Sequence, residues 1–489
     1  MIDDIQDHSS GTSHTRDGSG RRLNGPVRPG LASILFASLF VLATATGGSS
    51  IADALGQPIV RFSALILLAI GIMVGLEFDF RRYHVILWLF LAMLLLVAIQ
   101  LVPLPPMLWR SLPGRGAFDL SALLPEAASV WRPAAIVPVA AWNALFALLV
   151  PLSAFLLIGA VPRGQLALGV PLLASMVTIS SVVAALQFAG GAFDNPLINE
   201  SVGFASGLFA NRNHQALFLA IGIMAVAQWG ATRPFLHIRV MAAAVLTGWF
   251  VLMILATGSR AGLVLGLVAL AGGCTLVIGA LRRARVRIGL RALLIAGGLS
   301  AVALAGAIAT SLYAGRSESL NRLNDAAIGD DMRVRAMPVV IKILRNYLPT
   351  GAGQGSFVAL FKVEEPEALL KPTFFNHAHN DFFELVIEAG IPGVLLLFLC
   401  LAWLVLRAWE AWRQSPGEEV QRARLGSLVF LLVLMASVVD YPARTPIIMV
   451  TLVLAAAWLS IDPRLLYPLT GDPYRAGRPG ERWRGRSGS

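Results

Sequence analysis

Long apolar runs separated by short polar connections fill most of the chain, from residue 31 to residue 461. A helix that crosses a bilayer needs about 20 predominantly apolar residues, and runs of about this length recur throughout this region. They cover residues 31–46, 58–77, 84–104, 138–160, 166–188, 214–229, 238–256, 261–280, 292–314, 385–406, 425–440 and 445–461. The pattern predicts an all-α, polytopic integral membrane protein with about twelve transmembrane helices.

The two ends of the chain lack this pattern. Residues 1–30 are rich in Gly, Ser, Asp and Arg and carry no apolar periodicity, which predicts a disordered tail. Residues 462–489 form a second polar tail, which contains six arginines. The part between the tails divides at about residue 200 into N-terminal helices, residues 31–200, and a second region, residues 201–461, which contains most of the polar clusters described below.

Composition supports the membrane interpretation and excludes other classes. Hydrophobic residues make up 56% of the 489 residues and charged residues 14%, with a mean hydropathy of +0.72, which excludes a soluble globular domain. The net charge of +11 does not indicate nucleic-acid binding, because the arginines lie between apolar runs. Cys274 and Cys400 lie inside apolar runs, so a disulfide framework is excluded.

The distribution of arginine predicts the orientation of the chain in the bilayer. If the N-terminus lies inside, fourteen arginines fall on the inner connections and seven on the short outer ones. Positive charge concentrates on cytoplasmic loops, so both termini are predicted to be cytoplasmic. The longest connection, residues 315–384, then lies outside, and loops of this length are usually functional.

This long outer loop contains one amphipathic segment, residues 331–347. Apolar residues recur there near helical spacing, with basic residues between them. Such a helix either lies on the membrane surface, with a break at Pro338, or packs on neighbouring loops.

Four polar clusters interrupt the apolar pattern, and all four fall on the predicted outer face. The first, residues 207–214, places Asn211 and Asn213 before an apolar run, where they either cap a helix or contribute to a site. The second, residues 257–262, places Arg260 between two spans. Because an arginine is costly at the hydrocarbon edge, Arg260 either extends to lipid head groups or binds an anion.

The third cluster, residues 330–335, contains the acidic pair Asp330 and Asp331 and is followed by the glycine-rich residues 349–357. No strand precedes these glycines and no Gly-Lys-Ser/Thr follows them, so the pattern favours a flexible turn near the site over a nucleotide-binding loop. The acidic pair either caps the following helix or binds a divalent cation, for which two adjacent carboxylates are weak evidence.

The fourth cluster, residues 375–384, holds His377, His379 and Asn380 directly before a span. His-x-His spacing occurs in zinc sites, but no cysteine lies nearby. Histidine titrates near neutral pH and can accept a proton from a hydroxyl group. A catalytic base is therefore the sharper hypothesis, and a structural cap is its alternative.

At this fourth cluster the sequence resembles a known family. His379 and Asn380, followed after nine residues by Gly390 and after two more by Gly393, resemble the signature of the O-antigen ligase superfamily, which includes O-antigen and exopolysaccharide polymerases. Further similarity to the family covers residues 211–213, 257–262 and 333–357, so that the resemblance spans about residues 200–460.

The resemblance implies a multi-spanning glycosyltransferase of GT-C-like architecture in the bacterial inner membrane. Such enzymes take a glycan from an undecaprenyl diphosphate carrier at the periplasmic face. Ligases transfer it to lipid A-core, and polymerases transfer it to another carrier-linked glycan. The resemblance implies no cofactor and no metal, and it makes residues 201–461, with the periplasmic loop 315–384, the catalytic region. Other polysaccharide assembly proteins are further candidate partners, whereas nucleic acid is not.

The resemblance and the chemistry of the residues assign roles to the candidate site residues. Arg260, with Arg333 or Arg335, is expected to hold the diphosphate, because guanidinium groups match phosphate oxygens. His379 is expected to deprotonate the acceptor hydroxyl while the sugar C1 carbon is attacked from the opposite face, which inverts its configuration. The remaining candidate substrate-binding residues are His377, Asn380, Asn211 and Asn213.

Other functions are compatible with the spans alone. A transporter or flippase of lipid-linked glycans tends to place ionisable groups near the bilayer midplane, whereas charges gather here at the outer rim. A structural scaffold does not account for four polar clusters on one face. Between ligase and polymerase, Val394 and Leu395 stand where ligases often have two threonines, and residues 103–133 resemble polymerase segments, so a polymerase is favoured.

Overall fold

The computed structural model describes residues 30–119, 121, 123–190, 195, 197–198, 205–232, 237–284, 332–370, 375–415 and 417–460. Every predicted apolar run that falls within these residues forms helix, and the only strands among them are two short ones. The all-α prediction is confirmed for this part of the chain. The predicted run at 292–314, the acidic pair Asp330 and Asp331, and the two tails apart from Gly30 lie outside the described residues.

The N-terminal helices are apolar runs that end at residues unfavourable to helix. Two glycines, Gly47 and Gly48, follow the first helix, and the Asp79 side chain caps the third by accepting a hydrogen bond from the backbone of Arg82 at 3.2 Å. The bounds are α1 Leu31–Thr46, α2 Gly56–Met73, α3 Phe80–Gln100, α5 Pro138–Ala147, α6 Leu149–Gly159, η3 Arg163–Leu168 and α7 Gly169–Phe188.

The C-terminal helices begin at polar caps. The side chain of Asn211 caps one of them, that of Asn380 caps another, and Pro446 occupies the first position of the last. The bounds are α8 Arg212–Gly230, α9 His237–Ala256, α10 Arg260–Ala284, α15 Asp381–Arg413, α16 Glu418–Ser437, η6 Pro442–Arg444 and α17 Pro446–Leu459.

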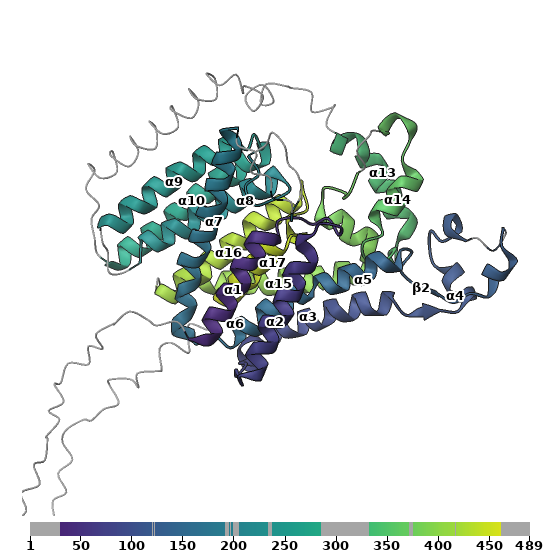
Figure 1. Cartoon of the computed structure of the whole chain (residues 1–489), viewed down its shortest axis with the longest axis horizontal. Helices are drawn as coiled ribbons and strands as arrows, with labels where there is room; N and C mark the ends of the chain where they lie inside the picture. Colours follow the sequence, from purple (N-terminus) through teal and green to yellow (C-terminus); the bar gives the residue numbers. More distant parts are fainter. Residues whose placement is uncertain are drawn as a thin grey trace, which may run out of the picture.

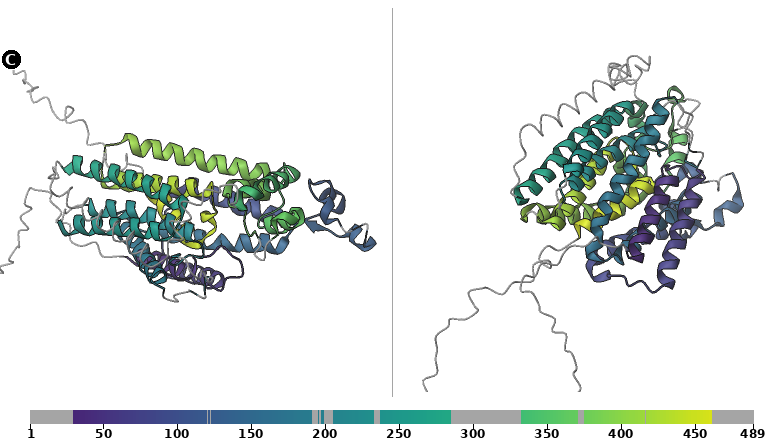
Figure 2. Two further views of the ribbon diagram at one scale, coloured as in Figure 1. Left: turned by 90° about the horizontal axis from the view of Figure 1, so that it is seen from above. Right: turned by 60° about the vertical axis from the view of Figure 1, so that its left-hand side comes forward.

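Short elements extend beyond one end of the helix bundle (Figure 1). Two antiparallel strands pair Pro103 with Pro133 and Leu104 with Arg132. These outer elements are β1 Pro103–Leu104, α4 Pro106–Ser111, η1 Gly116–Phe118, η2 Pro125–Ser129, β2 Arg132–Pro133, α13 Met332–Tyr347, α14 Phe357–Glu364 and η5 Glu367–Leu369. The left view of Figure 2 also places them at one end of the bundle. The connections predicted to lie outside therefore gather on one face.

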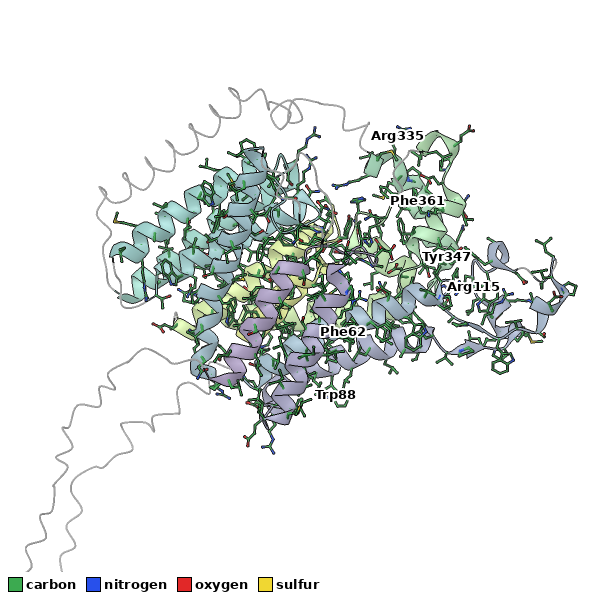
Figure 3. All side chains as sticks on the ribbon, in the orientation of Figure 1. Phe62, Trp88, Arg115, Arg335, Tyr347 and Phe361 are labelled. Atoms are coloured by element: carbon green, nitrogen blue, oxygen red, sulfur yellow. The ribbon has the colours of Figure 1, made fainter. Side chains whose placement is uncertain are left out.

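The helices have the length and surface of membrane spans. Eight of those in the described residues are long and apolar enough to cross a bilayer, and α1 and α17 are shorter apolar helices. Large apolar side chains are exposed on the bundle, as Phe62 and Trp88 illustrate at 67% each (Figure 3). A lipid environment removes the cost of this exposure. The chain is a multi-pass membrane protein.

Helix α8 forms the centre of the C-terminal part of the bundle. It packs against α7, α9, α10 and α16. Leu217, Phe218 and Leu219 are successive residues, yet all three are fully buried. A helix that is buried on every side is shielded by its neighbours rather than by lipid, so α8 fixes the position of its own capped end at Asn211.

The amphipathic segment of the long outer loop forms α13, which continues through Pro338. Its buried residues include Val340, Ile343 and Tyr347, which pack in one apolar cluster with Phe357 and Phe361 of α14. Of the two predicted alternatives, packing on neighbouring loops therefore describes α13, and its apolar face is covered by protein.

The glycine-rich loop after α13 is held against a break in α15. Gly390 has φ +57° and ψ −150°, which interrupts α15 and frees backbone groups on either side. The amide of Ala352 donates to the carbonyl of Ile387 at 2.9 Å, and that of Gly353 to Glu388 at 2.9 Å. This loop is therefore hydrogen-bonded in place rather than the flexible turn that its composition predicted.

The outer strands are joined to the same loop by a buried arginine. Arg115 is 2% exposed, and its guanidinium donates to the carbonyls of Ala134 at 2.6 Å and Gly351 at 3.4 Å. Burial lowers the pKa of Arg115 to about 10. Arg115 lies beside Tyr347 of α13 (Figure 3). The outer elements thus form one connected layer over the helix ends.

Candidate active site

All four polar clusters contribute a residue to one group around a carboxylate, Asp440, in the connection between α16 and η6. The Ser259 hydroxyl, directly before α10, donates to the side-chain oxygen of Asn213 at 2.7 Å. The amide of Asn213 donates to Asp440 Oδ2 at 2.7 Å, and His379 Nδ1 lies 3.2 Å from Asp440 Oδ1. With Arg333 of the third cluster, which also pairs with Asp440, residues from all four predicted clusters form one group.

Asp440 is buried and surrounded by donors. It is 1% exposed, and it also accepts a hydrogen bond from Asn211 at 3.1 Å and pairs with Arg333 at 3.4 Å. His214 Nε2 lies 3.7 Å from Oδ1. Burial raises the pKa of Asp440, but the contacts with His214 and His379 and the charge of Arg333 outweigh burial and hold this pKa well below its usual range. Asp440 is therefore an anion at neutral pH.

His379 is held in an unusual backbone conformation beside this anion. Its φ of +49° is the only positive φ of a non-glycine residue in the described part of the chain. This region is unfavourable for most L residues and persists only where the surroundings impose it. Nδ1 faces Asp440, and the side chain is 16% exposed. The pairing at Nδ1 leaves Nε2 as the nitrogen for exchanging a proton.

His377 differs from His379 because both of its ring nitrogens are engaged. Nδ1 lies 2.8 Å from Glu384 Oε1, and Nε2 lies 3.3 Å from the hydroxyl of Ser50. The Glu384 carboxylate also accepts the backbone amide of Ala378 at 2.8 Å. These contacts fix the ring of His377, whereas they leave it no unpaired nitrogen with which to act as a base.

An aromatic ring lies among the histidines. The ring centroid of Tyr441 is 4.0 Å from that of His377, 5.0 Å from that of His379 and 5.1 Å from that of His214. Burial and the charge of Asp440 raise the pKa of Tyr441 to about 12. Tyr441 therefore stays a neutral phenol, and its ring helps to fix the positions of the imidazoles.

A second charged group lies behind His377. Asp381, Glu384 and Glu388 share one face of α15, because they are three and four residues apart. Arg444 of η6 pairs with each of them, at 3.3 Å, 3.2 Å and 3.3 Å respectively. Burial alone lowers the pKa of Arg444, but these carboxylates outweigh it and raise this pKa above its usual value. The positive charge of Arg444 is thus balanced by carboxylates of the protein itself.

The predicted arginines occupy different positions. Arg333 of α13 reaches the centre of the group, where it donates to the carbonyl of Val439 at 3.1 Å besides pairing with Asp440. Arg335 donates instead to the carbonyl of Ala368 at 2.9 Å and lies on the outer layer, away from the group (Figure 3). Arg260 is exposed and is the first residue of α10, directly after Ser259.

Two of the three predicted asparagines, Asn211 and Asn380, serve as caps. The Asn380 side chain accepts the amides of Phe382 and Phe383 at 3.0 Å each and donates to the carbonyl of Val438 at 2.8 Å. Asn211 caps α8, but its amide also donates to Asp440. The predicted cap is therefore confirmed for Asn211, whose amide in addition contacts Asp440, while Asn380 positions the segment that carries His379.

The two histidines do not share one partner. His377 pairs with Glu384, and His379 pairs with Asp440. Within the described residues no group of three or more His, Cys, Asp or Glu side chains has a geometry suited to a metal ion. The site therefore contains two separate histidine–carboxylate pairs, and such pairs are suited to holding and moving protons.

The comparison with known families agrees with this geometry. Residues 242–398 match the family model described as O-antigen ligase. This matched region, called the ligase domain below, is the part of the chain that is similar to O-antigen ligases. The resemblance predicted from the histidine motif is confirmed, although the match covers less than half of the chain. No curated protein matches the chain significantly.

The ligase domain supplies only part of the group around Asp440. His377, His379, Arg260 and Arg333 lie within the matched residues. Asp440 lies beyond the match, as do Asn211, Asn213, Tyr441 and Arg444. Sequence reasoning missed Asp440 and Tyr441 as site residues. The available signal was a carboxylate in a short connection between two apolar runs on the predicted outer face.

The glycine spacing of the ligase domain has a steric cause. At Gly390 a Cβ atom would collide with the carbonyl oxygen of Pro349, and φ is +57°. At Gly393 a Cβ atom would collide with the Cβ of Ala389. The signature thus preserves the break in α15, and the first turns of this helix carry the carboxylates that face His377 and Arg444.

We expect Gly390→Ala to lower the thermal stability of the purified protein more than Gly75→Ala does. Both glycines have positive φ, but a Cβ at Gly75 would meet nothing within 4 Å. Gly75→Ala therefore incurs only the backbone cost of roughly 1 kcal/mol, whereas Gly390→Ala adds a collision with backbone. Thermal unfolding in detergent measures the difference, and equal losses in the two variants would contradict the steric explanation.

Proposed function

We propose that the chain transfers a glycan from an undecaprenyl diphosphate-linked donor to an acceptor hydroxyl at the periplasmic face of the bacterial inner membrane. The observation that carries the proposal is the pair formed by His379 and the buried anion Asp440, with Nε2 of a partly exposed imidazole left for the substrate. The matched O-antigen ligase domain supports glycan transfer as the reaction.

In the proposed step, Nε2 of His379 accepts the proton of the acceptor hydroxyl, and Asp440 stabilises the imidazolium that forms. The acceptor oxygen bonds to the sugar C1 from the face opposite the leaving group, and the bond between C1 and the phosphate oxygen breaks. Undecaprenyl diphosphate leaves with the electron pair, so the configuration at C1 inverts. Arg333 and Arg260 stabilise the negative charge on the diphosphate.

The position of the charged group favours an enzyme over a flippase. Asn211 precedes α8, Ser259 precedes α10, and Asp440 follows α16, so the group lies at helix ends rather than midway along the helices. Groups that carry a substrate across a bilayer tend to lie near its midplane. For the acceptor, the departure at Val394 and Leu395 favours a carrier-linked glycan, as used by polymerases, over lipid A-core.

Turnover by the purified protein in liposomes tests this function. The substrate is the lipid-linked glycan extracted from cells in which the gene has been deleted. We expect products in which two repeat units are joined, detected by mass spectrometry, and at least about 10²-fold less product with His379→Asn. Movement of the lipid-linked glycan between leaflets without a new glycosidic bond would support a flippase instead.

We further expect this activity to survive EDTA, because the proposed step uses only imidazole, carboxylate and guanidinium groups of the chain. Activity is measured before and after chelation in the same liposomes. Loss on chelation, with recovery on adding Mg²⁺, Mn²⁺ or Zn²⁺, would contradict a metal-independent step.

The proposed orientation places both termini in the cytoplasm, as the arginine distribution predicts. In a background of Cys274→Ala and Cys400→Ala, we expect an impermeant thiol reagent to label Met107→Cys in intact spheroplasts but not Ser415→Cys. Met107 is 85% exposed in α4, on the same face as the Asp440 group, and Ser415 is exposed at the opposite helix ends. The reverse labelling would place the site in the cytoplasm.

A further inference from the structure

Arg61 is a charged residue inside an apolar span. It lies on α2, whose residues Gly56–Met73 are long and apolar enough to cross a bilayer. Its Nη1 donates to the side-chain oxygen of Asn143 on α5 at 2.8 Å, and its Nη2 to that of Gln57 at 3.0 Å. Gln57 is one turn nearer the start of α2, so the guanidinium extends toward the end of the bundle that carries Asp440.

The charge of Arg61 is not matched by a carboxylate. None of the ion pairs between described residues includes Arg61, and its two partners are neutral amides. Its Nε atom is buried without a hydrogen-bond partner in the same part of the chain. Arg444 is different, because three carboxylates surround it. Arg61 is therefore a cation that two helices orient but do not neutralise, and an ionisable residue in a span is functional by default.

A short chain of contacts connects Arg61 with the candidate active site. The Gln57 amide donates to the carbonyl of Ser49 at 2.5 Å, and the hydroxyl of the next residue, Ser50, lies 3.3 Å from His377 Nε2. Gln57 belongs to α2, and Ser49 and Ser50 belong to the connection before it. All three lie outside the matched ligase domain. Arg333 and Arg260 approach the site from other elements, α13 and α10.

We propose that Arg61 binds a phosphate group at the lipid end of the acceptor, at an anion site separate from that of the donor. The inference rests on the proposed function, since two carrier-linked glycans bring two diphosphates to the same membrane surface. A guanidinium fixed by two amide oxygens keeps donors for phosphate oxygens and keeps its whole charge. Asn143 and Gln57 orient this group without competing for the charge.

Counting bound lipid tests the site without relying on turnover. Native mass spectrometry of the purified full-length protein with undecaprenyl diphosphate is expected to show two bound molecules for the wild type and one for Arg61→Gln. We expect Arg61→Lys to bind the second molecule more weakly. Arg81→Gln, a control at an exposed arginine at the start of α3, is expected to keep both molecules.

Kinetics in liposomes give the second readout. We expect Arg61→Gln to raise the KM for the acceptor by about tenfold, the effect of losing one charge-assisted contact, and to leave the donor KM unchanged. Two bound molecules in Arg61→Gln would overturn the inference. Displacement of the second molecule by phosphatidylglycerol would overturn it as well, because Arg61 would then be an ordinary contact to phospholipid head groups. If the wild type binds two molecules but forms no glycosidic bond, the proposed function fails while the binding site stands.

Discussion

Replacement of His379 by asparagine is expected to reduce glycan transfer by about 10²- to 10⁴-fold, the contribution of a general base, while donor binding and expression remain normal. Asparagine is the appropriate substitute because it tolerates the left-handed backbone conformation better than other L residues. The φ of His379 is +49°. His379→Ala is expected to lose transfer as well, but part of that loss would come from backbone strain.

His377→Ala is the informative comparison, and we expect it to keep measurable transfer. Both ring nitrogens of His377 are engaged, by Glu384 and by Ser50, so its loss removes a positioning contact rather than the proton acceptor. His84→Ala serves as a control, because His84 is exposed near the opposite end of the bundle. If His377→Ala abolishes transfer and His379→Asn does not, the assignment of the base is wrong.

Partial rescue would separate chemistry from folding. Added imidazole is expected to restore some transfer to His379→Gly, because glycine accepts the backbone conformation and leaves space for the missing ring. The same addition should not restore transfer to a variant that has lost its fold. Near-normal rates in all His379 variants would show that His379 is not the base, and a carboxylate on the same face would then be the candidate.

The helices could be predicted from the sequence because each one must present apolar side chains to lipid or to another helix. This requirement is local and is visible in every run. The capping role of Asn211 and Asn380 was predictable for the same reason, since a cap depends only on the residues next to it. The convergence of polar clusters on one face followed from alternating the direction of successive spans.

The pairing of particular side chains could not be predicted in this way. Asp440 and His379 are 61 residues apart and come from different helix ends. The alternating direction of successive spans places both residues on one face of the bundle. Only the packing of α15 against α16 makes them neighbours. Similarly, the composition of residues 349–357 predicts a flexible loop. The loop is fixed because the break at Gly390 leaves backbone carbonyls of α15 free to accept its amides.

Asp440→Asn is expected to reduce kcat by about 10²-fold or more, because it removes the charge that stabilises the imidazolium of His379 during proton transfer. Asparagine has nearly the same size as aspartate, but its amide nitrogen cannot accept a hydrogen bond, so the variant also loses either the contacts of Asn211 and Asn213 with Oδ2 or that of His379 with Oδ1. Asp119→Asn is the matched control, since Asp119 pairs with Arg110 on the outer layer and contacts neither histidine.

The pH dependence distinguishes a positioning role from a general loss of stability. The pKa of Asp440 is lower in the folded protein than in an unfolded chain, so its contribution to stability is present at neutral pH and is lost only as the pH falls through that low folded value. In Asp440→Asn, loss of the negative charge disfavours the protonated imidazole. We therefore expect the acidic limb of the profile of kcat/KM against pH to move to lower pH, together with the lower kcat. A variant that only unfolds more readily would keep the wild-type profile for its folded fraction, and that outcome would assign Asp440 to structure alone.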